Sequence, residues 1–202
     1  MTHEVLWERL VRLDRQETAK RAKCQYLSDQ ERYVITMLNA EYTVSLSDKR
    51  IFSVQASSQP IPAKFLEELC LLAYLINAQD LPLTNKLVKA EALPSGQFFF
   101  RGLHSLPTER LEKAFGQCPE RLLQAAKQLN AKRCEFGDVS IQLYVLPRIP
   151  LTIVIWGRCD EFGARASILF DQTAASHMPL DALLAAVEVA VDALIKAPEQ
   201  SS

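Results

Sequence analysis

Two short stretches of the sequence carry the side chains best suited to chemistry. In the first, Arg101 and His104 place a guanidinium, which can pair with carboxylates, near an imidazole, which can bind a metal or a polar atom. In the second, Trp156 ends an apolar run, and the adjacent carboxylates of Asp160 and Glu161 follow in a turn with glycine on both sides. Because neighbouring residues of an extended chain point in opposite directions, at most one of these carboxylates can face a given ligand.

A second isolated histidine widens the range of possible chemistry. His177 stands just before Pro179, where the last helix is expected to begin. Together with His104 it could supply two axial ligands to a bound metal or tetrapyrrole, or one ligand and one proton donor. Each histidine also has a structural interpretation, in which it caps a helix or hydrogen-bonds a backbone carbonyl. No sequence spacing shows that the two histidines meet in space, so both interpretations stay open.

Catalytic signatures are missing from the sequence. It contains no GxSxG, no HExxH, no glycine-rich phosphate loop and no CxxC pair. Its five cysteines are dispersed and lack the spacing of a zinc site. Such an odd, scattered set, without a signal-peptide pattern, predicts free thiols in a reducing cytoplasm.

The composition excludes several classes of partner. The chain has 202 residues, of which 49% are hydrophobic and 23% charged, so it can bury a sizeable core without disulfides or metals. A net charge of −1 argues against nucleic-acid binding. The longest apolar candidate, 180–195, is interrupted by acidic residues and is not expected to span a membrane. We therefore expect a cytoplasmic protein without nucleic-acid or membrane partners.

The elements are organised around residues 146–171. Residues 150–156 are apolar or β-branched on both faces, which predicts a strand buried inside a sheet. After the glycine-flanked turn, a strand over 164–170 should run back beside it. Alternation of apolar and polar residues predicts further antiparallel strands at 32–37, 41–46, 50–54 and 139–145. Apolar spacing and proline or glycine boundaries predict helices at 4–23, 63–78, 108–115, 119–129 and 179–195. A polar connector at 55–59 and a frayed tail at 196–202 complete the chain.

Runs of strands alternate with runs of helices without a βαβ rhythm, which predicts an α+β fold. We expect a single domain over residues 1–202, with a mainly antiparallel sheet packed on one face by the helices at 63–78 and 180–195. The second half of the helix at 4–23 has little apolar surface, so this helix could be peripheral.

Three segments in combination resemble domain-of-unknown-function family 3786, whose members come largely from anaerobic bacteria and archaea. These segments are QFFFRGLHSLP, LPRIPLTIVIWGRCDEFGARASILFD and ASHMPLDAL, and the resemblance covers about 65–195. It implies that Arg101, His104, Trp156 and the Asp160-Glu161 pair occupy family positions. The family often has a further acidic residue just ahead of this pair, which this chain lacks. The resemblance implies a fold and candidate positions, and no activity.

We expect ligand binding without turnover, and the favoured ligand is a planar metallated tetrapyrrole, either a corrinoid or haem. In this hypothesis Arg101 meets an anionic group, His104 meets the metal, and Trp156 forms a flat wall beside Asp160 or Glu161. One alternative is an enzyme that uses Asp160 or Glu161 with His104 as acid and base. Another is a scaffold that binds only protein partners.

Overall fold

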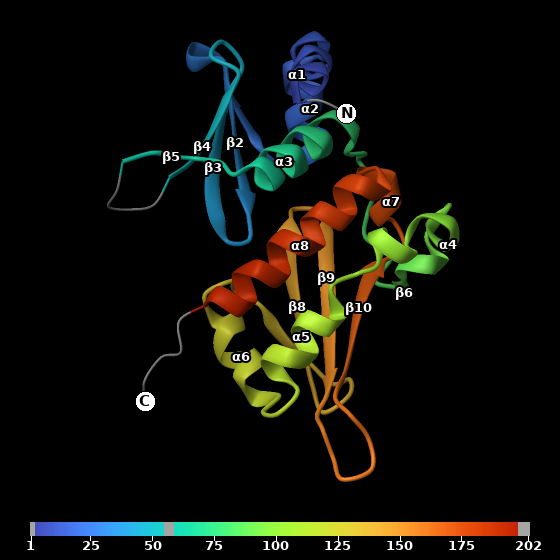
Figure 1. Cartoon of the computed structure of the whole chain (residues 1–202). Helices are drawn as coiled ribbons and strands as arrows, with labels where there is room; N and C mark the ends of the chain where they lie inside the picture. The colour runs from blue at the N-terminus through green and yellow to red at the C-terminus, as the bar shows by residue number, and fades with distance from the viewer. Residues whose placement is uncertain (1–2, 55–58, 198–202) are drawn as a thin grey trace.

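The structure is a computed structural model that describes residues 3–54 and 59–197 of the chain (Figure 1). Within these residues it contains two antiparallel sheets, with helices packed beside and between them. The predicted α+β class is therefore confirmed. The predicted connector at 55–59 and tail at 196–202 lie largely outside the described residues.

The N-terminal segment forms two helices where one was predicted. Helix α1 spans His3–Arg12 and helix α2 spans Arg15–Ala22. Asp14 separates them because its backbone is extended and its carboxylate accepts a hydrogen bond from the amide of Glu17 at 2.8 Å. This side chain caps α2 and prevents a continuous helix. Leu10 is fully buried, so α1 contributes to the core.

The predicted meander is confirmed and gains a short strand at each edge. The strand order is β1-β2-β3-β4-β5, and all neighbours are antiparallel. The strands are β1 (Gln25–Leu27), β2 (Arg32–Met37), β3 (Ala40–Ser45), β4 (Arg50–Val54) and β5 (Ile61–Pro62), and the 3-10 turn η1 (Ser28–Gln30) joins the first two. In β2, Tyr33, Ile35 and Met37 are buried and alternate with more exposed residues, as a strand covered on one face requires.

The second sheet holds the predicted buried strand at its centre. Its order is β6-β10-β9-β8-β7, again antiparallel throughout. The strands are β6 (Leu87–Lys89), β7 (Lys132–Cys134), β8 (Val139–Leu146), β9 (Ile149–Trp156) and β10 (Arg165–Asp171). Every residue of β9 is buried except Trp156 at its end. The prediction of an interior strand apolar on both faces is confirmed.

The two long helices lie close to their predicted bounds, at Phe65–Asn77 for α3 and Leu180–Lys196 for α8. They pack against each other, and α3 also packs against α1 and α2. The second sheet is covered instead by α5 (Thr108–Phe115) over β10 and by α6 (Glu120–Lys127) over β8, with α8 crossing both helices (Figure 1). The structure thus divides the predicted single sheet into two. It also buries α3 among helices, which explains its broad apolar surface.

Short helical turns form the remaining connections. They are η2 (Ala90–Ala92), α4 (Gly96–Phe99), η3 (Gly102–His104) and α7 (Ala174–His177). No helix in the described ranges combines the length and apolar character needed to cross a membrane. All five cysteines are free thiols, as predicted, and burial raises the pKa of the Cys24 thiol to about 12.

A buried arginine joins the two sheet regions. Arg148 lies in the tight turn between β8 and β9 and is 3% exposed. Its guanidinium donates hydrogen bonds to the carbonyl of Arg21 in α2, the carbonyl of Leu81 and the carboxylate of Asp80. The two sheets are also joined directly, because the amide of Leu38, which follows β2, donates to the carbonyl of Val145 in β8 at 3.1 Å.

We predict that Ile153→Ala lowers the free energy of unfolding by about 2–5 kcal/mol, because it removes a fully buried side chain from the centre of β9. Urea denaturation of the variant and the wild type measures this loss. Ile61→Ala is the matched control, since Ile61 is 46% exposed on an edge strand and its truncation should have a much smaller effect. Equal losses at the two positions would contradict the central place of β9 in the core.

Candidate functional site

Arg101 and His104 lie together on an exposed arm that precedes α5. Arg101 directly precedes η3, His104 ends it, and both side chains are exposed. The His104 ring stacks on Phe99, with ring centroids 4.5 Å apart and planes 10° from parallel. Phe100 is buried and its ring lies 6.3 Å from that of Phe170, which anchors the arm to β10. The sequence therefore placed these two residues correctly in one segment.

Trp156, Asp160 and Glu161 belong to the hairpin between β9 and β10. Trp156 ends β9 and is 41% exposed, and the two carboxylates lie on the exposed loop that follows. This loop extends beyond the end of the second sheet, whereas α4 lies beside β6 toward the opposite end of β10 (Figure 1). The structure does not bring the arm and the carboxylates into one pocket. The shared site, the flat Trp156 wall beside His104 and the acid/base pairing all lack the required geometry.

His177 is fully buried in α7 and separate from the exposed His104. Its Nδ1 accepts a hydrogen bond from the amide of Gln79 at 3.3 Å, and its Nε2 has no partner among the described residues. Burial, aided by the positive charge of Arg148, lowers the pKa of His177 to about 4. The residue therefore acts as a neutral core histidine. Within the described residues, no cluster of three or more His, Cys, Asp or Glu side chains could hold a metal.

A buried carboxylate that sequence reasoning missed lies at the end of β10. Asp171 is 1% exposed and accepts hydrogen bonds from the amides of Thr84, Asn85 and Thr173 and from two hydroxyl groups. Burial opposes its ionisation, but these hydrogen bonds outweigh burial and lower its pKa. Both carboxylate oxygens of Asp171 accept hydrogen bonds from the surrounding loops, so we assign this residue a structural role. An acid at the end of an apolar strand was the only signal in the sequence.

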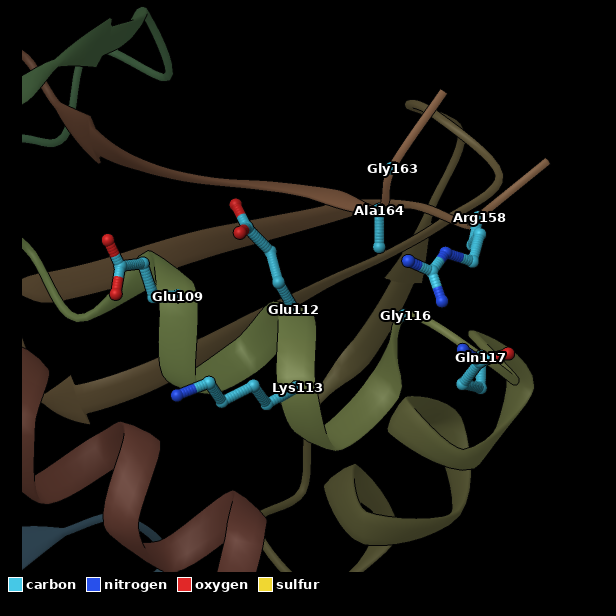
Figure 2. A pocket seen from close by; sticks show the side chains of 8 residues that line it. All are labelled: Glu109, Glu112, Lys113, Gly116, Gln117, Arg158, Gly163 and Ala164. Atoms are coloured by element: carbon cyan, nitrogen blue, oxygen red, sulfur yellow. The ribbon is translucent and has the colours of Figure 1, made fainter. Parts of the chain in front are cut away.

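A charged groove of about 500 Å³ lies between α5 and the β9–β10 hairpin (Figure 2). Its charged and amide side chains come from Glu109, Glu112, Lys113, Gln117 and Arg158, and Gly116, Gly163 and Ala164 complete the lining. Figure 2 shows Glu112 pointing from α5 toward the strand, while Arg158 reaches from the hairpin back toward the end of the helix. The groove therefore presents carboxylates and a guanidinium on facing walls.

Backbone contacts hold the two walls of the groove at a fixed distance. The amide of Arg158 donates to the carbonyl of Gly116 at 2.9 Å, and the amide of Ala166 donates to Oε1 of Glu112 at 3.0 Å. A Cβ atom at Gly116 would lie 2.3 Å from the Cβ of Ala164, so only glycine allows this close approach. The spacing between α5 and the hairpin is thus set by close packing of their main chains.

Sequence analysis pointed to the turn that forms one wall of this groove, but it named Asp160 and Glu161 there and not Arg158, and it missed the other wall. Arg158 lies in the turn that was singled out as the place where a buried strand ends. Glu109, Glu112 and Lys113 follow at helical spacing on α5, which the sequence marked only as a short capped helix. The signal that could have found them is the concentration of charge on a helix that had to pack beside that turn.

The fold and the groove define an α+β protein with a charged surface site and no metal cluster in its described residues. The model of the family described as "Domain of unknown function (DUF3786)" matches residues 14–193, and the chain belongs to this family. The match begins well before the region of about 65–195 that carries the resemblance in the sequence. Neither the comparison with curated proteins nor that with solved structures gave a match.

We predict that acidification destabilises the fold through His177. Its imidazole stays neutral in the folded protein, whereas in the unfolded chain it takes up a proton near pH 6.5. The contribution of His177 to stability is therefore complete above this pH and is lost as the pH falls toward 4, by about 3 kcal/mol in total. Asp171 adds a loss in the same direction, which begins as the pH falls through the ordinary titration range of aspartate.

Urea unfolding between about pH 7 and pH 5 isolates the contribution of His177 from that of carboxylates. The variant His177→Asn keeps a polar side chain but cannot take up the proton, so its stability should change less over this range. His104→Asn is the matched control because His104 is exposed, and it should retain the wild-type dependence. An unchanged dependence in His177→Asn would assign the effect to other groups.

Proposed function

We propose that this protein binds a small zwitterionic ligand, of the amino-acid or short-peptide class, in the charged groove without converting it. The supporting observation is that side chains of opposite charge line the groove without neutralising one another. Glu109, Lys113 and Arg158 have no hydrogen-bond or ion-pair partner for their side chains among the described residues. Arg158 can pair with a ligand carboxylate in a bidentate manner, while Glu109 and Glu112 can accept from a ligand ammonium group.

The chemistry of the lining favours binding over catalysis. Among the residues that line the groove there is no histidine, no cysteine and no hydroxyl side chain. A hydroxyl or thiol nucleophile activated by a neighbouring histidine therefore has no counterpart there. The acid/base alternative required His104 beside Asp160 or Glu161, and these residues lie toward opposite ends of β10. Binding without turnover, the first of the sequence-based hypotheses, is the one that the geometry supports.

The nature of the ligand differs from the tetrapyrrole favoured by the sequence. A haem or corrinoid needs broad apolar walls and an accessible axial ligand. His104 is accessible, but Trp156 lies on the other segment and His177 is buried in the core. The groove, in contrast, has the size of a small-ligand site and groups that recognise both charges.

Titration with free amino acids, followed by amide NMR shifts, tests the proposal. N-acetylated amino acids lack the ammonium group and amino-acid amides lack the carboxylate, so neither should bind as well as the zwitterion. Arg158→Ala should weaken binding about tenfold, since it removes a charge-assisted hydrogen bond. Arg133→Ala, which changes an exposed arginine on β7, should leave binding unchanged. If no zwitterion shifts the amides of residues 109–117 or 158–164, the proposal fails.

Haem or corrinoid titration distinguishes this proposal from the tetrapyrrole hypothesis. We expect the absorption spectra of wild type and His104→Ala to be identical after addition of either compound, because His104 lies on an open arm without a facing wall. A spectral shift present only in the wild type would restore His104 as an axial ligand. Purified protein that already absorbs in the visible range would lead to the same conclusion.

A further inference from the structure

Strand β10 is longer than the strand that pairs with its outer edge. On one side β9 pairs with β10 from Arg165 to Phe170. On the other side β6 pairs only with Leu169, Phe170 and Asp171. The chain then turns away from β10 in η2, where the carbonyl of Ala90 packs so tightly against Gly96 that a Cβ there would lie 2.0 Å from it. In the described part of the chain, no strand covers the outer edge of residues 165–168.

The register shows which main-chain groups face this open edge. The amide of Gln172 donates to the carbonyl of Lys86 at 3.0 Å, so Gln172 directs its hydrogen-bonding groups toward β6. Because this direction alternates along a strand, Ala166 and Ile168 also face the outer side, and Ile168 borders the Leu169–Lys89 pair where the β6 ladder ends. The hydrogen bond from the amide of Ala166 to Glu112 confirms the direction, since Glu112 lies outside the sheet on α5.

The open edge of β10 lies along a hollow in the protein surface. A cavity of about 270 Å³ follows the edge and is lined by Ala166, Ser167 and Ile168, by the end of β6, and by Ser105, Leu106 and Thr108 ahead of α5. The uncovered part of β10 spans four residues, which corresponds to about 13 Å of strand. Edge strands with free hydrogen-bonding groups are the usual templates for strand addition.

The amide of Ala166, the first outward-facing donor of this edge, donates a hydrogen bond to the carboxylate of Glu112. Glu112 is half-buried, and it accepts the only hydrogen bond described for the amide of Ala166. An incoming strand can replace this contact with a main-chain carbonyl and release the carboxylate. Glu109 lies one helical turn before Glu112, and Glu91 lines the far end of the cavity. A basic side chain beside Glu112 would therefore meet the carboxylates of α5, whereas at the far end of the cavity Lys89 accompanies Glu91 and offsets its charge.

We propose that the outer edge of β10 binds an extended segment of a partner protein, which adds a strand in line with β6 and places a lysine or arginine beside Glu112. Affinity comes from main-chain hydrogen bonds to Ala166 and Ile168, and the charge selects the segment. This inference goes beyond the zwitterion site, because it rests on the unpaired edge of the sheet and not on Arg158. It gives the protein a second surface, on the other side of the Glu112 contact from the groove.

Synthetic peptides with blocked ends provide the probe. Acetyl-Thr-Val-Lys-Val-Thr-amide should shift the amide signals of Ala166 and Ile168 and slow their hydrogen exchange by about tenfold or more at saturation, because each amide gains a main-chain partner. The analogue with proline in place of lysine cannot continue the ladder and should protect neither amide. The analogue with glutamate should bind more weakly than the lysine peptide. Absence of protection with every peptide would overturn the proposal.

Substitution of Glu112, whose carboxylate binds the amide of Ala166, gives the sharpest test. In Glu112→Ala the amide of Ala166 loses its acceptor, so its exchange should accelerate in the free protein and slow again when the peptide binds. The neutral peptide acetyl-Thr-Val-Thr-Val-Thr-amide should bind Glu112→Ala about fivefold more tightly than wild type, since a competing hydrogen bond of about 1 kcal/mol is removed. Glu120→Ala, on the neighbouring helix α6, is the matched control and should behave as wild type.

Three further outcomes separate this proposal from its alternatives. Arg158→Ala should weaken amino-acid binding about tenfold and leave peptide protection intact, so the two proposals can fail independently. Protection of Ile168 by free amino acids would assign the edge to the small-ligand site and overturn strand addition. Protection that rises with protein concentration in the absence of peptide would identify a second copy of the chain as the occupant, and would overturn the partner segment.

Discussion

The guanidinium of Arg148 is the interaction on which the arrangement of the two sheets depends. It is buried at the turn between β8 and β9, and it binds main-chain carbonyls of α2 and of the segment after α3, together with Asp80. A charge buried this deeply is tolerated only when its donors are satisfied, so each of these segments must stay in place. Loss of any one of them would leave a buried charge or carbonyl without a partner. Burial is the main cause of the lowered pKa of the neighbouring His177, and the positive charge of Arg148 adds to it. One turn of the second sheet thus holds helix α2 and the loop after α3 in place.

In the second sheet, the outer edge of β10 is only partly covered by β6. At one end of β10, Asp171 accepts hydrogen bonds from the amides of the surrounding loops. Toward the other end, β6 has already turned away, and a side chain of α5 takes its place at Ala166. The charged groove and the open edge lie on either side of this single contact between Glu112 and the strand. Both candidate surfaces therefore arise from one structural fact, which is that β10 extends further than its outer neighbour.

Charged side chains and aromatic side chains are concentrated in different parts of the molecule, the charged groove and the exposed arm before α5. The exposed arm carries Arg101 and His104 beside aromatic rings, while the groove carries carboxylates and Arg158 and no aromatic side chain. A flat, apolar ligand and a charged, small ligand would therefore need different sites. The separation explains why the combination of histidine, arginine and tryptophan suggested a tetrapyrrole from the sequence and finds no common pocket in the structure. The residues are present, but β10 holds their segments toward opposite ends.

The sequence by itself determined the local elements of this protein. The meander, the buried strand β9 and helix α5 follow from the alternation of apolar residues and from caps and breakers, which act over a few residues. The end of the buried strand, where Arg158 lines the groove, could also be predicted, because polar residues there have no place in the core. The division into two sheets, the break at Asp14 and the partners of α3 depend on contacts between distant segments. The same holds for the facing wall of the groove, for the burial of His177 and for the short pairing of β6. Only the tertiary structure decided these features, because burial and pairing are properties of the neighbours a residue acquires on folding, and one sequence does not specify those neighbours by local pattern.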